Sequence, residues 1–477
     1  MLNTTIAGTK PRQDALKNAF RRAPVSENDK TWFVGMVLTA ISCTGLLLIQ
    51  SIGTYGTIIF LLPFLILLAL RLSQIIDGLR KDAFVLLFPI WAVLSTVWSA
   101  YPEWTLWAST ELLVTMIVGI ALASSVPYRS ILSGLTIAVW IVSILSLASG
   151  TVGISGINGE AALIGIFGSK NQLALTAAFL LILSYSQFFY TKRSHVTTVY
   201  YLLSAVMALY ILKRALSIGT AVSVVIAFAL TFMLRFTCKF KPKHRSAVLG
   251  VIIFLFITGI VLLATNVISL SAILKALGKD PTLTGRTVLW DYASTYIAEH
   301  PLNGVGYQAF WQLDNRRALQ LWILFDETPG VGFHFHNTYY STGVELGLIG
   351  ILIVIFTYAR AIYRCSGKLL STEKTVPSKE KHYLIFATGA LFFLFIRSFI
   401  EVDLTFQFTL ADIIFCLIWR YSSSQAIGEK KAKTVQPAWS RHRHQNHDES
   451  DEQTGHDGPA PALAAKTGFR VSTRQVE

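Results

Sequence analysis

The sequence predicts an all-α polytopic membrane protein with about twelve transmembrane helices and one long extracytoplasmic loop that contains interfacial helices. Hydrophobic residues make up 53% of the 477 residues and charged residues 14%, whereas a soluble domain carries about 25% charged residues. Apolar runs of about 20 residues, long enough to cross a bilayer core of about 30 Å, recur along almost the whole chain. The lysines and arginines between these runs are distributed unevenly, as is typical of membrane topology.

Twelve apolar segments are candidate spans. They are residues 31–50, 55–70, 83–99, 107–126, 131–149, 172–190, 196–212, 216–235, 246–268, 339–359, 383–400 and 404–420. The second and the twelfth are short, so either could be tilted or half-inserted. No cleavable signal peptide is expected, because the first 30 residues are polar and basic and have no apolar core.

Three regions follow from these segments. Residues 1–30 are expected to form a cytoplasmic N-terminal segment, and residues 31–420 a transmembrane domain in which 269–338 is a long periplasmic loop. Residues 421–477 are polar and contain several Pro and Gly, so they cannot bury a core, and a disordered cytoplasmic tail is expected. Histidines in that tail could bind a metal weakly, but a solvated low-complexity segment is the simpler interpretation.

The distribution of lysine and arginine predicts the orientation. If the N-terminus is cytoplasmic, the inner connections carry most of the basic residues. The outer connections and adjoining span ends then hold Lys170, Lys213, Arg214 and Arg397. This asymmetry is the positive-inside signal, and it makes both termini cytoplasmic. It also accounts for most of the formal net charge of +14, so the charge indicates membrane topology and not nucleic acid binding.

The long loop 269–338 ends in a pair of histidines, in the stretch "GFHFHNTYYSTGVELG". Loops of this length within a compact architecture are usually functional. A helix is expected over 284–300, with Thr284 as N-cap and Pro301 after its end. Arg286 would lie in the first turn of that helix, where a cation opposes the helix dipole. An anionic partner would explain this position, and a solvated arginine is the alternative.

Three stretches carry a resemblance to a known family. They are "FGSKNQLA" (167–174), "TGRTVLWDYASTYIAEHPLNGVGYQAFW" (284–311) and "HFHNTYYSTGVELGLIGILI" (334–353). Together they resemble the O-antigen ligase and Wzy-type polymerase superfamily, most closely the exopolysaccharide repeat-unit polymerases of the ExoQ type. The resemblance covers most of residues 30–420. The succession of Arg, Trp, HPLxGxG and HN is specific as a whole, whereas any single piece would be weak.

The resemblance implies a reaction and its partners. Such enzymes, in the bacterial inner membrane, take a saccharide from a polyprenyl-pyrophosphate carrier at the outer face and pass it to a hydroxyl of an acceptor glycan. It implies neither a metal nor a nucleotide cofactor. A flippase and a chain-length regulator of the same pathway are candidate protein partners. Residue by residue, it points to His336, Arg286 and Arg214.

One stretch departs from the family pattern. The family usually has an LSxS[RK]T-like sequence where this chain reads "LKRALSIGTAV". The basic residues Lys213 and Arg214 precede the Leu-Ser here, whereas the family's basic residue follows it. Both still fall at the outer mouth of two spans, so one of them is expected to bind the carrier.

The chemistry of the expected reaction suits these residue types. Negative charge grows on the pyrophosphate as the glycosyl bond breaks, and arginines stabilise it through charge-assisted hydrogen bonds. Lys170, Arg214, Arg286 and Arg397 are the cations available on the outer side. The acceptor hydroxyl must lose a proton, and histidine titrates in the useful range. His336 precedes a good N-cap, Asn337, whose positive helix end would help to keep the imidazole neutral.

Alternative interpretations apply to the histidines and to the acidic residues. His334 and His336 could bind a metal with Asp326 or Glu327, or could be structural polar residues at the membrane interface. Glu345, about two turns inside a span, could pair with Arg397 or orient the acceptor. Arg397, Glu401 and Asp403 are expected to form a salt-bridged network that supports the site.

The sequence therefore predicts an integral-membrane glycosyltransferase of the polymerase type. It would transfer saccharide chains from lipid pyrophosphate to another lipid-linked repeat unit. An O-antigen ligase, whose acceptor is lipid A core, shares the same chemistry. A transporter of a glycan or lipid-linked glycan is the alternative of another class, for which repeat halves, broken helices and midplane charges would be expected.

The predicted orientation can be tested with topology reporters. An alkaline phosphatase fused within residues 300–320 should be active, because that loop is expected outside the cytoplasm. A fusion after residue 425 should be silent. An active C-terminal fusion would reverse the orientation and place the histidine pair on the wrong side for the expected carrier.

Overall fold

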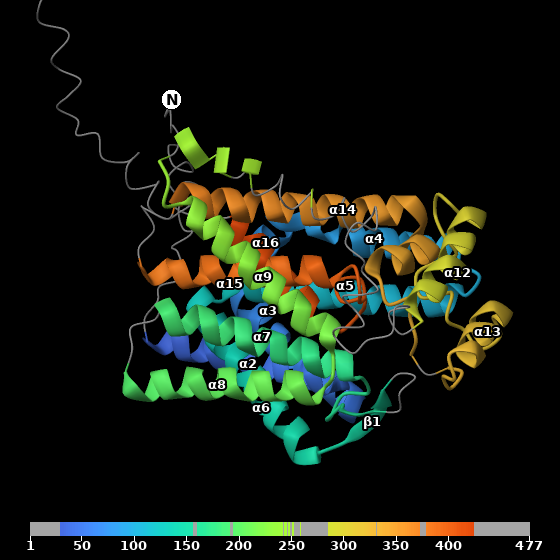
Figure 1. Ribbon diagram of the computed structural model, residues 1–477, viewed down its shortest axis with the longest axis horizontal. Coiled ribbons are helices and arrows are strands. Elements are labelled where there is room, and N and C mark those ends of the chain that lie inside the picture. Colours follow the sequence, from blue (N-terminus) through green and yellow to red (C-terminus); the bar gives the residue numbers. More distant parts are fainter. Residues whose placement is uncertain are drawn as a thin grey trace, which may run out of the picture. The chain divides into compact units, whose positions relative to one another are not determined.

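The computed structural model describes residues 29–155, 160–190, 194–241, 285–330, 332–372 and 378–423, together with single residues and short pieces between 243 and 258. The described part is a bundle of α-helices with one small two-stranded sheet, as Figure 1 shows. The expected tail 421–477 and the ninth expected span, 246–268, lie mostly outside the described residues.

The helices and strands follow in chain order. They are α2 (Asp29–Ile52), α3 (Thr54–Asp82), η1 (Ala83–Leu86), α4 (Leu87–Leu94), η2 (Ser95–Val97), α5 (Pro102–Ser125), α6 (Tyr128–Ser149), β1 (Val152–Ser155), β2 (Glu160–Leu163), α7 (Lys170–Tyr190), α8 (His195–Arg214), α9 (Ile218–Thr237), α12 (Arg286–Glu299), α13 (Arg316–Leu324), α14 (Thr338–Thr372), α15 (Ser378–Arg397) and α16 (Leu410–Ser423). Strands β1 and β2 pair antiparallel.

Seven helical segments in the described part of the chain are long and apolar enough to cross a membrane. They are Thr31–Ile52, Thr54–Val97, Pro102–Ser125, Tyr128–Ser149, His195–Arg214, Ile218–Thr237 and Thr338–Leu370. Large apolar side chains remain exposed on several of them, for example Ile58, Leu70 and Val225. A soluble protein rarely exposes apolar surface on this scale. The chain is therefore an integral membrane protein of the all-α class, while the expected count of about twelve spans is not confirmed.

Two expected spans, 55–70 and 83–99, are parts of one helical segment that runs from Thr54 to Val97. Arg71 has non-helical backbone angles (φ −137°, ψ 24°) and marks a kink within it. Charged residues after this point lower the hydropathy of the sequence, but Arg and Lys are good helix formers. A stretch that hydropathy assigns to a loop is therefore helical. The twelfth expected span also differs, because α16 begins at Leu410 and the residues just before it form turns.

Helix α14 contains a second break, at Gly347 (φ 65°, ψ −164°). The loop 301–306, part of "HPLNGVG", uses this break to dock on the helix. The Gly306 amide donates to the Glu345 carbonyl (2.8 Å), and the Leu348 amide donates to the Pro301 carbonyl (2.8 Å). A Cβ at Gly347 would fall 2.3 Å from the backbone of Leu302. This contact holds α12 and the loop that follows it against the N-terminal part of α14 (Figure 1).

A second, smaller core lies between α12, α13 and the chain that precedes α14. Its fully buried members include Leu289, Trp322 and Phe335. Aromatic rings supply much of this core. The rings of Phe310 and Trp311 both contact the Phe335 ring, with centroid distances of 5.1 and 5.0 Å. The long loop is thus a packed unit in its described part, and the expected helix is confirmed as α12 (Arg286–Glu299). The expected N-cap at Thr284 is wrong, because Gly285, with a φ of 81°, stands at that position and no side chain caps the helix.

The break in α14 predicts a large difference between two glycines of the same helix. Gly347→Ala should destabilise the protein by on the order of 1–3 kcal/mol or more, because those backbone angles suit glycine and the new methyl group would meet backbone atoms. Gly367→Ala is the matched control, since a Cβ there meets nothing within 4 Å. Thermal unfolding of the detergent-solubilised protein measures both. Equal unfolding temperatures would contradict the docking described above.

Candidate functional site

The two histidines of the "HFH" stretch lie on the same side of the chain because the residue between them is buried. Phe335 is 0% exposed, and Trp290 donates a hydrogen bond to its carbonyl (2.9 Å). In extended chain, alternate side chains point in opposite directions, so burial of Phe335 turns His334 and His336 together. Their ring centroids are 4.3 Å apart. The His336 amide donates to Nδ1 of His334 (3.0 Å), and His336 has a positive φ of 50°.

Asn337 fixes this stretch to the start of α14. Its side-chain oxygen accepts from the amides of Tyr339 (2.9 Å) and Tyr340 (3.2 Å), so the expected N-cap is confirmed. Its side-chain nitrogen donates to the Phe399 carbonyl (2.9 Å), and Thr338 donates to the Glu401 carbonyl (2.8 Å). The histidine stretch is thereby joined to the chain that follows α15.

Glu401 lies at the centre of the site and is 4% exposed. Its Oε1 accepts from Nη2 of Arg286 (2.7 Å) and from Nδ2 of Asn171 (2.8 Å). Its Oε2 lies 3.4 Å from Nδ1 of His336 and 3.9 Å from Nε2 of His334. Four segments far apart in sequence therefore meet at one carboxylate. Burial alone would raise the pKa of Glu401, but Arg286, His336 and Arg397 hold it well below its usual range, so the carboxylate is ionised.

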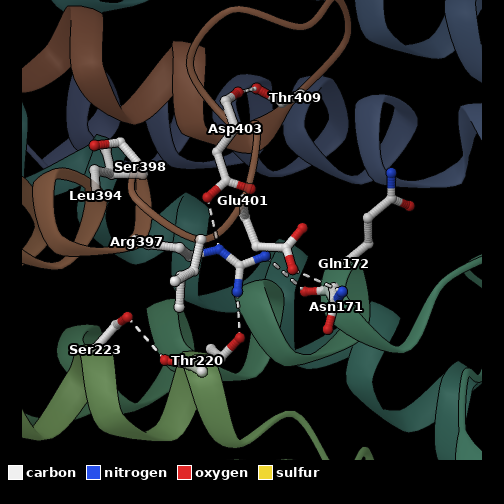
Figure 2. Close-up of polar contacts among 12 residues, drawn as sticks. Asn171, Gln172, Thr220, Ser223, Leu394, Arg397, Ser398, Glu401, Asp403 and Thr409 are labelled. Atoms are coloured by element: carbon white, nitrogen blue, oxygen red, sulfur yellow. Dashed lines mark hydrogen bonds and ion pairs between the residues drawn. The ribbon is translucent and has the colours of Figure 1, made fainter. Parts of the chain in front are cut away.

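Arg397 lies behind Glu401 and is 1% exposed. Its Nε donates to Oδ2 of Asp403 (2.6 Å), its Nη1 to the hydroxyl of Thr220, and its Nη2 to the Asn171 carbonyl (3.0 Å). Figure 2 shows this guanidinium enclosed by its partners, with Glu401 beside it. Of the expected network, the ion pair of Arg397 with Asp403 is present, whereas Glu401 pairs with Arg286. Arg397 is buried behind the site and does not face outward. Its role in binding substrate stays a prediction.

The other expected binding residues are close in sequence to residues that contact this centre. Lys170 is the first residue of α7 and precedes Asn171. Lys213 and Arg214 are exposed in the last turn of α8, where a cation also suits the helix dipole. Ser217, three residues later, donates to the side-chain oxygen of Asn171 (3.0 Å). The turn between α8 and α9 therefore contacts Asn171, which in turn bonds Glu401. That Lys170, Lys213 and Arg214 bind the carrier stays a prediction.

Glu345 is buried at 7% exposure, two turns into α14. The backbone of Gln308, just after the loop that docks on α14, is hydrogen-bonded to the Glu345 carboxyl group. Arg397 has Asp403 as its carboxylate partner, so the pairing of Glu345 with Arg397, weighed from the sequence, is wrong. Charge sign and span position suggested that pair, but the turn after α15 supplies a nearer carboxylate. A role of Glu345 in orienting the acceptor stays a prediction.

A metal interpretation of the histidine pair meets an obstacle in the hydrogen bonding. Within the described residues, His334, His336 and Glu401 form a group whose ligand atoms lie within 4.8 Å of one another, so Glu401 replaces Asp326 and Glu327 as the carboxylate to consider. A metal on Nε2 of His334 would leave the ring proton on Nδ1. That nitrogen already accepts the His336 amide proton, and Arg286 already neutralises Glu401. These contacts would have to rearrange before a metal could bind to the three residues.

Sequence patterns missed two members of the site, Asn171 and Thr220. Both are common polar residues near helix N-termini, and neither pattern nor charge distinguished them. Asn171 stands next to Lys170 in "FGSKNQLA", where charge singles out the lysine and not the amide. The neutral amide is the group that bonds Glu401.

The different burial of the two arginines predicts different costs of removing them. Arg397→Ala should destabilise the protein by roughly 3–5 kcal/mol, because it leaves Asp403 buried without its counter-ion. Arg286→Ala should cost less, since the Arg286 side chain is 19% exposed and Asn171 still donates to Glu401. Thermal unfolding of the two purified variants measures the difference. Wild-type stability of Arg397→Ala would contradict the supporting role assigned to this side chain.

Comparison with known proteins gives a similar protein of the type that the motifs resemble. No protein-family model matches the chain. The chain is 28% identical over 332 residues to "Exopolysaccharide production protein ExoQ" of Rhizobium meliloti (strain 1021), and this match covers 69% of the chain and 74% of that protein. The chain is thus a homologue of ExoQ, an exopolysaccharide production protein.

Proposed function

We propose that this protein is an exopolysaccharide polymerase of the inner membrane. It transfers a saccharide chain from a polyprenyl-pyrophosphate carrier to a hydroxyl of an acceptor lipid-linked repeat unit at the periplasmic face. One observation carries the proposal: His336 and Arg286, which come from two separate motif segments, meet at the same buried carboxylate, Glu401. A candidate base and a candidate phosphate-binding cation are thus held close together by one carboxylate, and glycosyl transfer from a pyrophosphate needs both groups near the sugar.

Arg286 suits the leaving group. Its guanidinium has five N–H donors, and the bonds to the Ile400 carbonyl and to Glu401 use two of them. These bonds fix its plane, so further donors are held ready for phosphate oxygens without reorganisation. As the bond between the sugar C1 and the pyrophosphate oxygen breaks, the electron pair leaves with the pyrophosphate, and this cation stabilises the growing charge. Lys213, Arg214 and Lys170 would add positive charge around the carrier.

His336 suits the acceptor. The acceptor oxygen attacks C1, and its proton goes to a ring nitrogen of His336, which then returns it to solvent or to the departing pyrophosphate. His334 cannot take this role as it stands. Burial, together with the nearby His336 and Arg286, lowers the pKa of His334 to about 3, and its Nδ1 already accepts the His336 amide proton. The proposal requires no metal or nucleotide, because the protein's own cations stabilise the leaving group.

Two alternative functions, that of a ligase and that of a transporter, can be compared with the polymerase. A ligase would use the same site with lipid A core as acceptor. A transporter would be expected to break its helices at the middle of the membrane. The break in α14 at Gly347 is occupied by the docked loop 301–306, and the ionic groups of the site gather near the N-terminus of α14. These observations favour an enzyme over a transporter.

A flippase and a chain-length regulator are the protein partners that such a polymerase would have.

Complementation of a gene-deletion strain tests the function and separates the two histidines. The wild-type gene should restore high-mass surface polysaccharide. His336→Ala should reduce it by roughly 10²-fold or more, as is usual for loss of a general base, and lipid-linked single repeat units should accumulate. His334→Ala should keep substantial activity, and a chelator should leave wild-type activity unchanged.

Other results would assign another function. Unattached lipid-linked chains of full length in the deletion strain would indicate a ligase. Equal losses from both histidine substitutions, together with rescue by added zinc, would establish a metal site in place of the base proposed here.

A further inference from the structure

The two oxygens of the Glu401 carboxylate face different partners. Oε1 receives hydrogen bonds from Arg286 and Asn171, and Oε2 faces Nδ1 of His336 at 3.4 Å. The backbone of the same residue is also held, because its carbonyl accepts from the Thr338 hydroxyl (2.8 Å). Contacts from three other segments therefore fix both the position and the direction of Oε2. A carboxylate restrained in this way can hold a neighbouring ring in one orientation.

The protonation of the ring follows from this contact. An ionised carboxylate accepts hydrogen bonds and donates none, so the ring nitrogen that faces Oε2 must carry the proton. For His336 that nitrogen is Nδ1, and the lone pair of the neutral ring is then on Nε2. His334 shows the opposite arrangement, because its Nδ1 accepts the His336 amide proton and its Nε2 must carry the ring proton. Of the two adjacent rings, His336 is the one that presents Nε2 as a base.

We infer that Glu401 is the positioning residue of His336. It holds the ring in the tautomer whose Nε2 takes the proton of the acceptor hydroxyl, and it stabilises the imidazolium that results. The inference rests on the proposed function and adds to it the residue that makes His336 competent. In the step, the acceptor O–H bond breaks and an N–H bond forms at Nε2, while the proton on Nδ1 stays on the ring and Glu401 remains a carboxylate.

The surrounding charges make this carboxylate necessary. Two ionisable groups lie directly beside His336 in the described residues: Glu401 at 3.4 Å and His334, whose ring centroid is 4.3 Å away. Arg286 and Arg397 act on the same Glu401 carboxylate. Both arginines oppose a positive charge on His336, and His334 stays neutral. Glu401 is the anion of this group, so its removal should make the His336 ring hold a proton less tightly.

The pH dependence of the rate distinguishes this role from a purely structural one. The experiment uses the purified full-length protein in nanodiscs with a lipid-linked repeat unit, and measures polymerisation between pH 5 and 9. Glu401→Gln should lower the rate by roughly 10²-fold or more, because an amide N–H facing Nδ1 favours the tautomer that has no base at Nε2. Its acid limb, where His336 takes up a proton, should move to lower pH by about one unit or more.

Two matched variants serve as controls. Glu401→Asp keeps the charge, so its acid limb should stay close to that of the wild type even if its rate falls. Asp403→Asn removes a carboxylate two residues away whose partner is Arg397, and because Asp403 does not contact the ring it should move the acid limb much less than Glu401→Gln does. An unmoved acid limb in folded Glu401→Gln would overturn the inference. Full activity of His336→Ala would instead overturn the proposed function itself.

A second measurement needs no substitution at Glu401. Nitrogen-15 NMR of histidine-labelled wild-type protein reports the tautomer of each ring, and the signal of His336 is identified by its loss in His336→Gln. We expect the proton of the neutral ring on Nδ1. A proton on Nε2 would show that Glu401 does not orient the ring as inferred, whatever the effect of Glu401→Gln on folding.

Discussion

The site depends on one buried ionised carboxylate, that of Glu401. Removing a carboxylate from water is costly unless donors and opposite charges replace the water, and here Arg286 and Asn171 supply them directly. Those donors come from different helices, so the energetic requirement of one residue brings distant segments of the chain together. The positions of His336 and Arg286 are then consequences of the same requirement. Arg397 is paired with Asp403 and lies behind Glu401, where its positive charge also favours the ionised form of the Glu401 carboxylate.

A second constraint, steric and not electrostatic, holds the long loop in position. Gly304 and Gly347 both have positive φ, and a side chain on either would meet the opposing backbone. The loop backbone therefore lies directly on α14, and α12 with Arg286 at its start is held near the helix that follows His336. The small aromatic core around Phe335 adds to this by turning both histidines outward. Hydrogen bonding, packing and charge thus act on the same short segment, 334–338.

Local patterns in the sequence predicted the local features of the structure. The helix α12 and the cap at Asn337 depend on residues within a few positions of one another, and both are confirmed. Features that depend on contacts between distant segments could not be predicted from the sequence. The continuity of Thr54–Val97 and the break at Gly347 depend on packing against distant segments, and no periodicity reports such contacts. Hydropathy also could not distinguish a charged helical stretch from a loop, which is one reason the expected span count is not confirmed.

The candidate site shows the same division. Motif and charge singled out His336 and Arg286, and the network around Arg397 was expected from the spacing of 397–403. The central place of Glu401 could not be predicted, because it depends on Asn171 and on the histidines more than sixty residues away. The sequence left open whether Arg397 also faces the carrier, and the structure gives its guanidinium three internal partners. Which of several charged residues faces the substrate is a property of the folded arrangement and not of the local sequence.

The most direct test of the account is reconstitution of the reaction with defined components. The purified full-length protein is placed in liposomes with a polyprenyl-pyrophosphate-linked repeat unit, a chelator, and no nucleotide, and the saccharide length and the released polyprenyl pyrophosphate are measured. The account predicts chains longer than one repeat unit, with one polyprenyl pyrophosphate released for each new linkage, and no product from His336→Ala. Absence of elongation by the folded wild-type protein until a divalent metal is supplied would contradict it.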